Sequence, residues 1–170
     1  MGEQACAFTW LPLQCYGSEE VATRTAKATP HSPLDPLTRE ERSERMGRVR
    51  AKDTGPEMAV RRLVFSMGYR YRLHSKRLPG RPDLVFPKFH KVIFVHGCFW
   101  HRHEGCARTR VPKTRRDFWF RKFKENRARD RKHQAALVAL GWEYAVIWEC
   151  EAARPDVVEK RVRRFLEGRE

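Results

Sequence analysis

The chain carries the sequence Lys-Val-Ile-Phe-Val-His-Gly-Cys-Phe-Trp-His-Arg-His-Glu-Gly-Cys at residues 91–106, where an apolar segment changes abruptly into a polar one. Residues 92–95 are β-branched or aromatic, which is typical of a buried strand. Three histidines, two cysteines and the adjacent pair Phe99 and Trp100 follow. A strand that ends at such a group of metal-ligand side chains favours a functional site, and a loop that is merely rich in histidine and cysteine is the simpler alternative.

The composition narrows the class of protein. A length of 170 residues suits one domain with a single core. Lysine and arginine number 36 against 21 acidic residues, and the net charge of +15 favours a polyanionic partner, with DNA or RNA ahead of a membrane surface. No apolar run approaches the roughly 20 residues of a membrane span, and no secretory signal is evident. Five scattered cysteines indicate a reducing compartment, so we expect a cytoplasmic protein.

The N-terminal residues differ from the rest of the chain. Residues 1–37 mix glycine, proline, serine and threonine without a helical or strand period, which predicts a disordered leader. Residues 38–170 are predicted to form the folded domain. It begins with a highly charged stretch, residues 37–50, that favours a short helix followed by a basic arm.

The periodicity of the remaining chain predicts an α/β fold. Thr54 and Glu57 have the spacing of a capping box, which gives Glu57 a purely structural explanation. Gly68 and Gly141 fit the positions just after two helices. We predict helices over residues 54–67, 117–140 and 155–166, and strands over 69–73, 84–86, 91–95 and 142–148, the last buried on both faces. The expected architecture is therefore a mixed sheet of about four strands, the first three in an antiparallel meander, flanked by helices.

Four side chains could bind a structural zinc ion. His103 and Cys106 share one loop, and Cys150 follows the last predicted strand. Asp130 falls on the apolar side of the helix over residues 117–140, where a lone carboxylate needs a salt bridge or a metal. Two thiolates, an imidazole and a carboxylate form a plausible tetrahedral zinc site.

A second candidate site contains Asp83, at the start of a strand beside the sequence Pro-Gly-Arg-Pro. Its carboxylate could bind Mg²⁺, and His96 or His101 could act as a general base. The simpler interpretations are a turn residue for Asp83 and loop hydrogen bonds for the histidines. Phe99 and Trp100 either divide between core and surface or form a wedge that unstacks DNA bases.

Three motifs together resemble the very short patch repair (Vsr) DNA mismatch endonucleases. They are Leu-Pro-Gly-Arg-Pro-Asp at residues 78–83, Val-Ile-Phe-Val-His-Gly-Cys-Phe-Trp-His at 92–101 and Ile-Trp-Glu-Cys at 147–150. The resemblance implies a restriction-endonuclease-like core and Mg²⁺-dependent nicking of one strand of double-stranded DNA. The nick would lie 5′ to the thymine of a T·G mismatch, a product of 5-methylcytosine deamination. It also implies a nucleoid-associated enzyme with mismatch-repair proteins as partners, and we expect a monomer.

The resemblance also implies roles for individual residues. Asp83 would bind Mg²⁺ together with the backbone carbonyl of Val95, where a family member has threonine. His101 would activate water, with Glu57 and His96 as supporting groups. The aromatic pair Phe99 and Trp100 would intercalate beside the mismatch, and Met46 would insert from the opposite groove. The structural zinc ligands would be His103, Cys106, Asp130 and Cys150, in a loop one residue longer than the family's.

Two other functions remain open on the residues alone. One is a non-catalytic, zinc-braced DNA-binding module, in which Asp83 and Glu57 serve only as turn and cap. The other is a restriction-type nuclease that cuts both strands of paired DNA. The strand over residues 91–95 lacks the acidic-x-Lys pattern expected for that activity, which makes it less favoured than the mismatch endonuclease.

Overall fold

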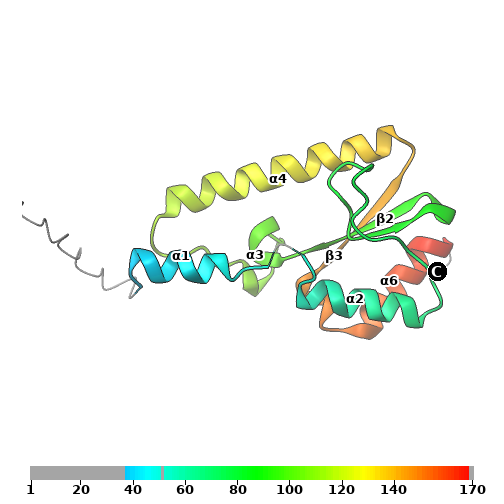
Figure 1. Cartoon of the computed structure of the whole chain (residues 1–170), viewed down its shortest axis with the longest axis horizontal. Helices are drawn as coiled ribbons and strands as arrows, with labels where there is room; N and C mark the ends of the chain where they lie inside the picture. Colours follow the sequence, from blue (N-terminus) through cyan, green and yellow to red (C-terminus); the bar gives the residue numbers. More distant parts are fainter. Residues whose placement is uncertain (1–36, 51, 169–170) are drawn as a thin grey trace, which may run out of the picture. The chain divides into compact units, whose positions relative to one another are not determined.

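The structure is a computed structural model that describes residues 37–50 and 52–168. The predicted leader therefore lies outside the described residues except for Leu37. The elements are α1 (Arg39–Gly47), α2 (Gly55–Ser66), β1 (Leu84–Phe86), η1 (Pro87–Phe89), β2 (Lys91–His96), α3 (Cys98–His101), η2 (Ala107–Thr109), α4 (Arg116–Ala139), β3 (Glu143–Trp148), α5 (Glu149–Ala152) and α6 (Pro155–Glu167) (Figure 1). Among the described helices, none is long and apolar enough to cross a membrane.

The sheet is mixed, as predicted, but it has three strands rather than about four. In the order β1-β2-β3, β2 pairs antiparallel with β1 and parallel with β3. The predicted strand over residues 69–73 is wrong, because the segment makes only an isolated bridge between Arg72 and Val85. Two residues later His74 has φ 45°, which turns the chain away from the extended conformation that a longer ladder needs.

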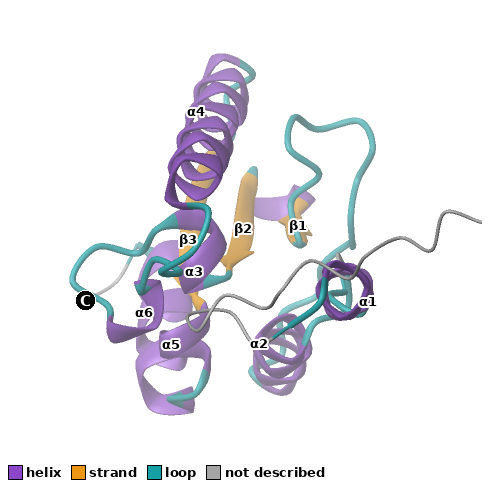
Figure 2. Cartoon of the chain, turned by 90° about the vertical axis from the view of Figure 1, so that its left-hand side faces the viewer, coloured by secondary structure: helices purple, strands orange, loops and turns teal. Residues whose placement is uncertain are grey.

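Helices cover both faces of this sheet, so the core consists of two apolar layers (Figure 2). Side chains alternate between the faces along β2, as in any strand. Ile93 packs with α2 and α6, whereas Val92 and Phe94 pack with Leu137 of α4. The prediction that the last strand is buried on both faces is wrong. Of β3 only Ile147 is buried, because β3 lies at the edge of the sheet.

Local sequence signals place the helix ends well. Gly68, with φ 90°, and Gly141, with φ 75°, adopt the left-handed conformation after α2 and α4. Thr54 precedes α2, but its side chain does not cap the helix. Its hydroxyl instead donates to Glu57 Oε1 at 2.9 Å, and the Asp53 amide donates to Glu57 Oε2 at 2.9 Å. Glu57 thus reaches back as a capping box requires, but one residue further than predicted.

Candidate active site and metal centre

A cleft of about 890 Å³ collects most of the predicted catalytic residues. Its lining comes from the segment before α2, the loop before β1, the end of β2, α3 and α4. It includes the predicted residues Glu57, Asp83, Val95, His96, Trp100, His101 and Asp130. Basic side chains share the wall, namely Arg50, Lys52, Arg81, Lys122 and Arg129. Acidic and imidazole groups are therefore surrounded by positive charge, as a site for a phosphodiester would require.

Asp83 is held at the end of β2 by one backbone hydrogen bond. The amide of Val95 donates to Asp83 Oδ2 at 2.7 Å. Burial raises the pKa of Asp83 to about 6, and the nearby Glu57 carboxylate contributes to the rise. The hydrogen bond from Val95 and the electrostatic effects of His74 and Arg61 act in the opposite direction. A poorly solvated carboxylate is a hard oxygen donor, which fits Mg²⁺.

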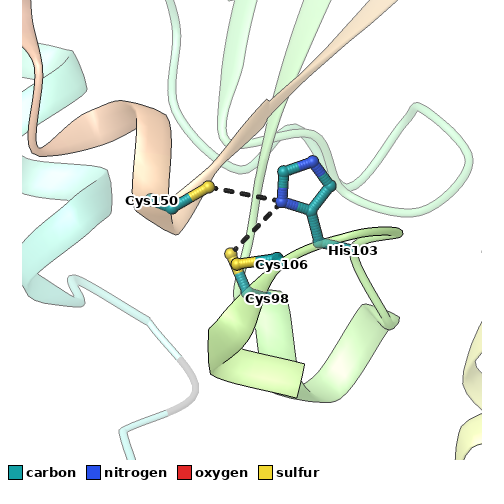
Figure 3. A group of neighbouring side chains, drawn as sticks. All are labelled: Cys98, His103, Cys106 and Cys150. Carbon is teal, nitrogen blue, oxygen red and sulfur yellow. Dashed lines mark hydrogen bonds between the residues drawn. The ribbon is translucent and has the colours of Figure 1, made fainter. Parts of the chain in front are cut away.

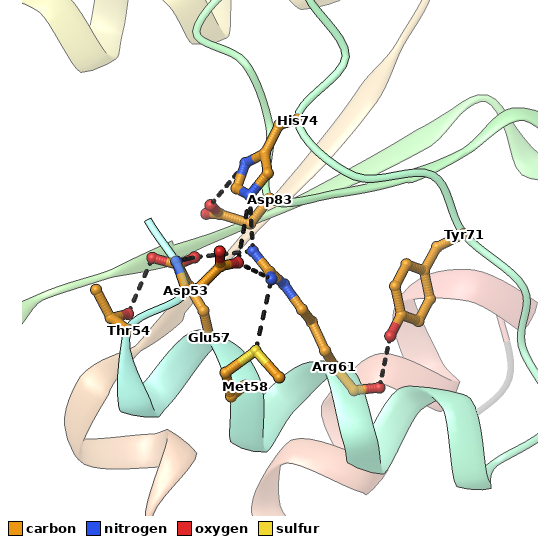
Figure 4. A network of polar contacts seen from close by, with 8 residues as sticks. All are labelled: Asp53, Thr54, Glu57, Met58, Arg61, Tyr71, His74 and Asp83. Atoms are coloured by element: carbon orange, nitrogen blue, oxygen red, sulfur yellow. Dashed lines mark hydrogen bonds and ion pairs between the residues drawn. The ribbon is translucent and has the colours of Figure 1, made fainter. Parts of the chain in front are cut away.

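Glu57 is buried at the start of α2, where Arg61 contacts it one helical turn later (Figure 4). Arg61 Nη2 lies 2.8 Å from Glu57 Oε2 and 2.9 Å from His74 Nε2. Nδ1 of the same histidine lies 3.9 Å from Asp83 Oδ1. Sequence reasoning missed Arg61 and His74. A charge at the i+4 position of Glu57, on the buried side of a helix, was the available signal.

His101 and Asp130 form a close pair, with 2.6 Å between His101 Nδ1 and Asp130 Oδ2. Burial tends to raise the pKa of Asp130, but the hydrogen bond and charges of His101, with smaller effects of other basic groups, lower it overall. The ring of His96 stacks on His101, with centroids 3.9 Å apart. Burial lowers the pKa of His96 to about 4, so this histidine is neutral at pH 7. Asp130 thus fixes the orientation of His101 through its Nδ1 atom, an arrangement that also occurs in catalytic carboxylate–histidine pairs.

A separate cluster contains three thiols and one imidazole (Figure 3). His103 Nδ1 lies 3.3 Å from Cys150 Sγ and 3.7 Å from Cys98 Sγ, and Cys106 completes the group. Tetrahedral zinc places nitrogen and sulfur ligands about 3.6 Å apart, so this donor set fits zinc. Trp148 stacks on the imidazole with centroids 4.3 Å apart. Four protein ligands would leave no open position, as in a structural site.

The structure groups a different fourth side chain with three of the predicted zinc ligands. Asp130 lies against His101, and Cys98 takes its place beside His103, Cys106 and Cys150. The reason is that residues 98–101 form the helical turn α3 instead of an extended loop. That turn directs Cys98, which is fully buried, toward Cys150 at the start of α5.

Phe99 and Trp100 belong to an aromatic cluster on α4. The centroid of Phe99 lies 5.3 Å from that of Trp119 and 5.2 Å from that of Phe123. The backbone carbonyl of Trp100 accepts a hydrogen bond from Asn126 Nδ2 at 3.1 Å. Trp119, in the first turn of α4, belongs to the same cluster and was not among the predicted site residues. Both members of the pair remain partly accessible, and Trp100 also lines the cleft.

Met46 lies apart from this group. It belongs to α1, whose nine residues include none that is buried, and its side chain is 43% exposed. It does not line the cleft, although Val49 and Arg50 shortly after α1 do. Its predicted role in the opposite groove of DNA stays a prediction.

Comparison with known proteins shows to which family the chain belongs. Residues 34–108 match the family model described as DNA mismatch endonuclease Vsr. The type II nicking enzyme V.XorIIP of Xanthomonas oryzae pv. oryzae is 52% identical over 133 residues, which cover 78% of this chain and 97% of that protein. The chain belongs to the Vsr family. The V.NmeAIP nicking enzyme of Neisseria meningitidis is 39% identical over 78% of this chain and 94% of its own. DNA mismatch endonuclease Vsr of Escherichia coli is 41% identical over 109 residues, which cover 64% of this chain and 69% of that protein.

Membership in the Vsr family identifies the protein as an endodeoxyribonuclease that acts on DNA. Among the described residues, the basic cleft brings acidic and imidazole groups together, which is the kind of site that such a nuclease needs. Because members of this family are nucleases, family membership argues against the non-catalytic DNA-binding module that the residues alone left open.

Proposed function

We propose that this Vsr-family enzyme nicks one strand of duplex DNA on the 5′ side of the thymine in a T·G mismatch, with Mg²⁺ as the catalytic ion. The observation that carries the proposal is that Asp83 and the His101–Asp130 pair line the same cleft, whose wall also carries basic side chains. We further infer that the enzyme acts as a monomer on chromosomal DNA in the cytoplasm. Cooperation with mismatch-repair proteins stays a prediction from the family resemblance.

Asp83 and the backbone carbonyl of Val95 are the groups that would hold Mg²⁺. The ion, when bound, offsets phosphate charge and polarises the scissile bond. Asp83 is suited to this because its carboxylate is fixed by the Val95 amide and poorly solvated, so it gains more from a cation than an exposed carboxylate would. Glu57 and His96 line the same cleft and would orient water at its floor.

His101 is the proposed general base. Asp130 accepts a hydrogen bond from Nδ1–H of His101, which leaves Nε2 free to take a proton from the attacking water. The imidazolium that forms is stabilised by the Asp130 carboxylate. Because the stacked His96 is neutral at pH 7, it adds no like charge beside His101. In this arrangement the pair accepts one proton, at Nε2 of His101, which Asp130 holds in place.

Recognition of the mismatch would rest on Phe99 and Trp100, with Met46 from the opposite groove. Inserting aromatic wedges into a base step costs a few kcal/mol, and a mismatched step costs least. The proposed zinc ligands Cys98, His103, Cys106 and Cys150 support this role, since Cys98 is the first residue of the helical turn that carries both rings. Zinc would thereby fix the position from which the rings enter DNA.

A cleavage assay tests the proposal. Duplexes that differ only in one pair, T·G or T·A, are labelled on each strand in turn and incubated with the enzyme and Mg²⁺. We expect a single nick, 5′ to the mispaired thymine, and none in the T·A duplex. Equal cutting of both duplexes would contradict the mismatch specificity, and cutting of both strands would favour the restriction-type alternative.

A further inference from the structure

A second group of metal-ligand side chains lies beside Asp83. Asp53, Glu57 and His74 offer two carboxylate oxygens and an imidazole nitrogen within 4.8 Å of one another. Such a set would suit a divalent cation. The guanidinium of Arg61 already lies among them (Figure 4), with Nη2 2.8 Å from Glu57 and 2.9 Å from His74. Nη1 forms an ion pair with Asp53 at 2.5 Å.

Stability alone explains this arrangement poorly. Arg61 is 4% exposed and Glu57 5%, so both charges are removed from water. Among the described residues, Nε of Arg61 is the only buried side-chain nitrogen or oxygen without a hydrogen-bond partner. Apolar residues of similar volume stabilise a protein at least as well as a buried ion pair does. A positive charge that is buried and incompletely satisfied next to a proposed catalytic carboxylate therefore points to a role in the site.

The contact with His74 connects Arg61 to Asp83. A guanidinium can only donate hydrogen bonds, so His74 Nε2 must accept the one from Arg61. The other ring nitrogen of His74, Nδ1, lies 3.9 Å from Asp83 Oδ1. Arg61 thereby orients His74 toward the carboxylate that we propose to hold Mg²⁺.

We propose that Arg61 is a positioning residue that occupies the cluster of Asp53, Glu57 and His74 as a permanent cation. It closes this cluster to divalent metal, holds Glu57 in place and directs His74 at Asp83. The inference rests on the proposed function, because it assigns Asp83 as the metal-holding carboxylate of the cleft. It extends that function by assigning a role beside the metal-holding carboxylate to Arg61.

Counting bound Mn²⁺ by electron paramagnetic resonance tests the closed cluster without any nicking. On the zinc-loaded full chain, Arg61→Ala should bind one Mn²⁺ more than the wild type, and the extra ion should be lost in Arg61→Ala/Asp53→Asn. Asp53→Asn alone should leave the wild-type count unchanged. An unchanged count in Arg61→Ala would overturn the proposal. If the single variant Asp53→Asn binds fewer Mn²⁺ ions than the wild type, the proposal is overturned too. This second comparison needs no change at a buried site, since the Asp53 side chain is 62% exposed.

Nicking kinetics test the positioning role. Arg61→Ala should lower kcat about 10- to 100-fold, as the loss of a group that orients a metal ligand does, with little change in the KM for DNA. Arg61→Lys should retain part of the rate, and added guanidinium ions should partly restore Arg61→Ala. A wild-type kcat in Arg61→Ala would overturn the proposal. A kcat of Arg61→Ala that is equally low with and without guanidinium would also overturn it. If wild type does not nick T·G duplexes at all, the proposed function fails while the Mn²⁺ counts still decide the assignment of Arg61.

Discussion

Two residues of the cleft, one buried and one largely shielded from solvent, have opposite effects on stability. The pKa of Asp83 rises from 3.8 to about 6, so in that window the folded state binds the proton more tightly and stability falls as the pH rises. The pKa of His96 falls from 6.5 to about 4, so the unfolded state binds the proton more tightly and stability falls as the pH falls. The two contributions largely cancel between pH 4 and 6. Each becomes measurable when the other residue is replaced.

Asp83→Asn should therefore stabilise the zinc-loaded protein at pH 7 in Mg²⁺-free buffer. The side chain is 17% exposed, and removing its poorly solvated charge should add on the order of 1–3 kcal/mol to the free energy of unfolding. The same variant should lose stability more steeply than wild type as the pH falls from 6.5 to 4, because the effect of His96 is no longer offset. Urea denaturation over this pH range measures both effects. A variant less stable than wild type at pH 7 would contradict the burial argument.

Asp130→Asn should lower the nicking rate about 100-fold or more. An asparagine cannot stabilise the imidazolium of His101 and can present its amide group to Nδ1, which favours the wrong tautomer. The matched control is Asp117→Asn, an exposed carboxylate in the first turn of the same helix, which should leave the rate unchanged. Single-turnover nicking of a T·G duplex provides the measurement. Equal rates for the two variants would exclude Asp130 from catalysis.

At the level of elements, the thiol cluster joins α3, the loop after it and α5. Glu149 strengthens the same junction, since its Oε2 accepts from the Cys98 amide at 3.2 Å and its Oε1 accepts from Arg108 at 2.8 Å. Burial raises the pKa of the Cys98 thiol to about 12, so without a metal this thiol stays protonated at pH 7. Zinc would ionise it, and loss of zinc should loosen the turn that bears Phe99 and Trp100.

Zinc content distinguishes the two possible ligand sets. Cys98→Ser should lose zinc and should lower the melting temperature, because it removes one of four ligands. Asp130→Ala should keep one zinc per chain, because its carboxylate pairs with His101 instead. Metal analysis of the purified variants measures this. Zinc retained in Cys98→Ser and lost in Asp130→Ala would restore the set that the sequence predicted.

At the level of the whole molecule, the charge of +15 extends beyond the cleft. A second hollow of about 360 Å³ lies along α4, and it is lined by Arg102, Phe120, Phe123, Lys124, Arg127 and Arg131. The cleft uses other residues of the same helix, among them Lys122 and Arg129. The two sets lie on different faces of α4, since at 3.6 residues per turn their mean directions differ by roughly 130°. A duplex that contacts both sets would have to extend from the cleft around this helix.

The salt dependence of DNA binding tests this extension. Replacing Lys124, Arg127 and Arg131 with alanine should reduce the slope of log K against log salt by about 1 to 3, since each lost phosphate contact contributes about 0.9. A control with Lys160, Arg163 and Arg164 of α6 replaced, a helix on the other side of the sheet, should change the slope little. Equal slopes for the two triple variants would argue against a DNA path along α4.

Sequence alone predicted what local signals determine. Periodicity and glycine positions gave α2, α4 and α6 within a few residues, because a helix depends on neighbours three and four positions away. It failed where tertiary packing decides. The helical face of Asp130 was clear, but whether it meets a metal or His101 depends on how α4 lies over α3. Cys98 reaches His103 only because α3 forms a turn of helix, and two partners of Arg61 come from the segments before and after α2.

The most direct test of the central claim is single-turnover nicking of a T·G duplex by Asp83→Ala, with DNA binding measured on the same preparation. The account predicts that nicking is abolished while the affinity for the mismatch stays near that of wild type, since Lys, Arg and the aromatic rings supply the contacts to DNA. Nicking at a rate close to wild type would show that the chemistry takes place without this carboxylate, and would contradict the assignment of the cleft as the active site.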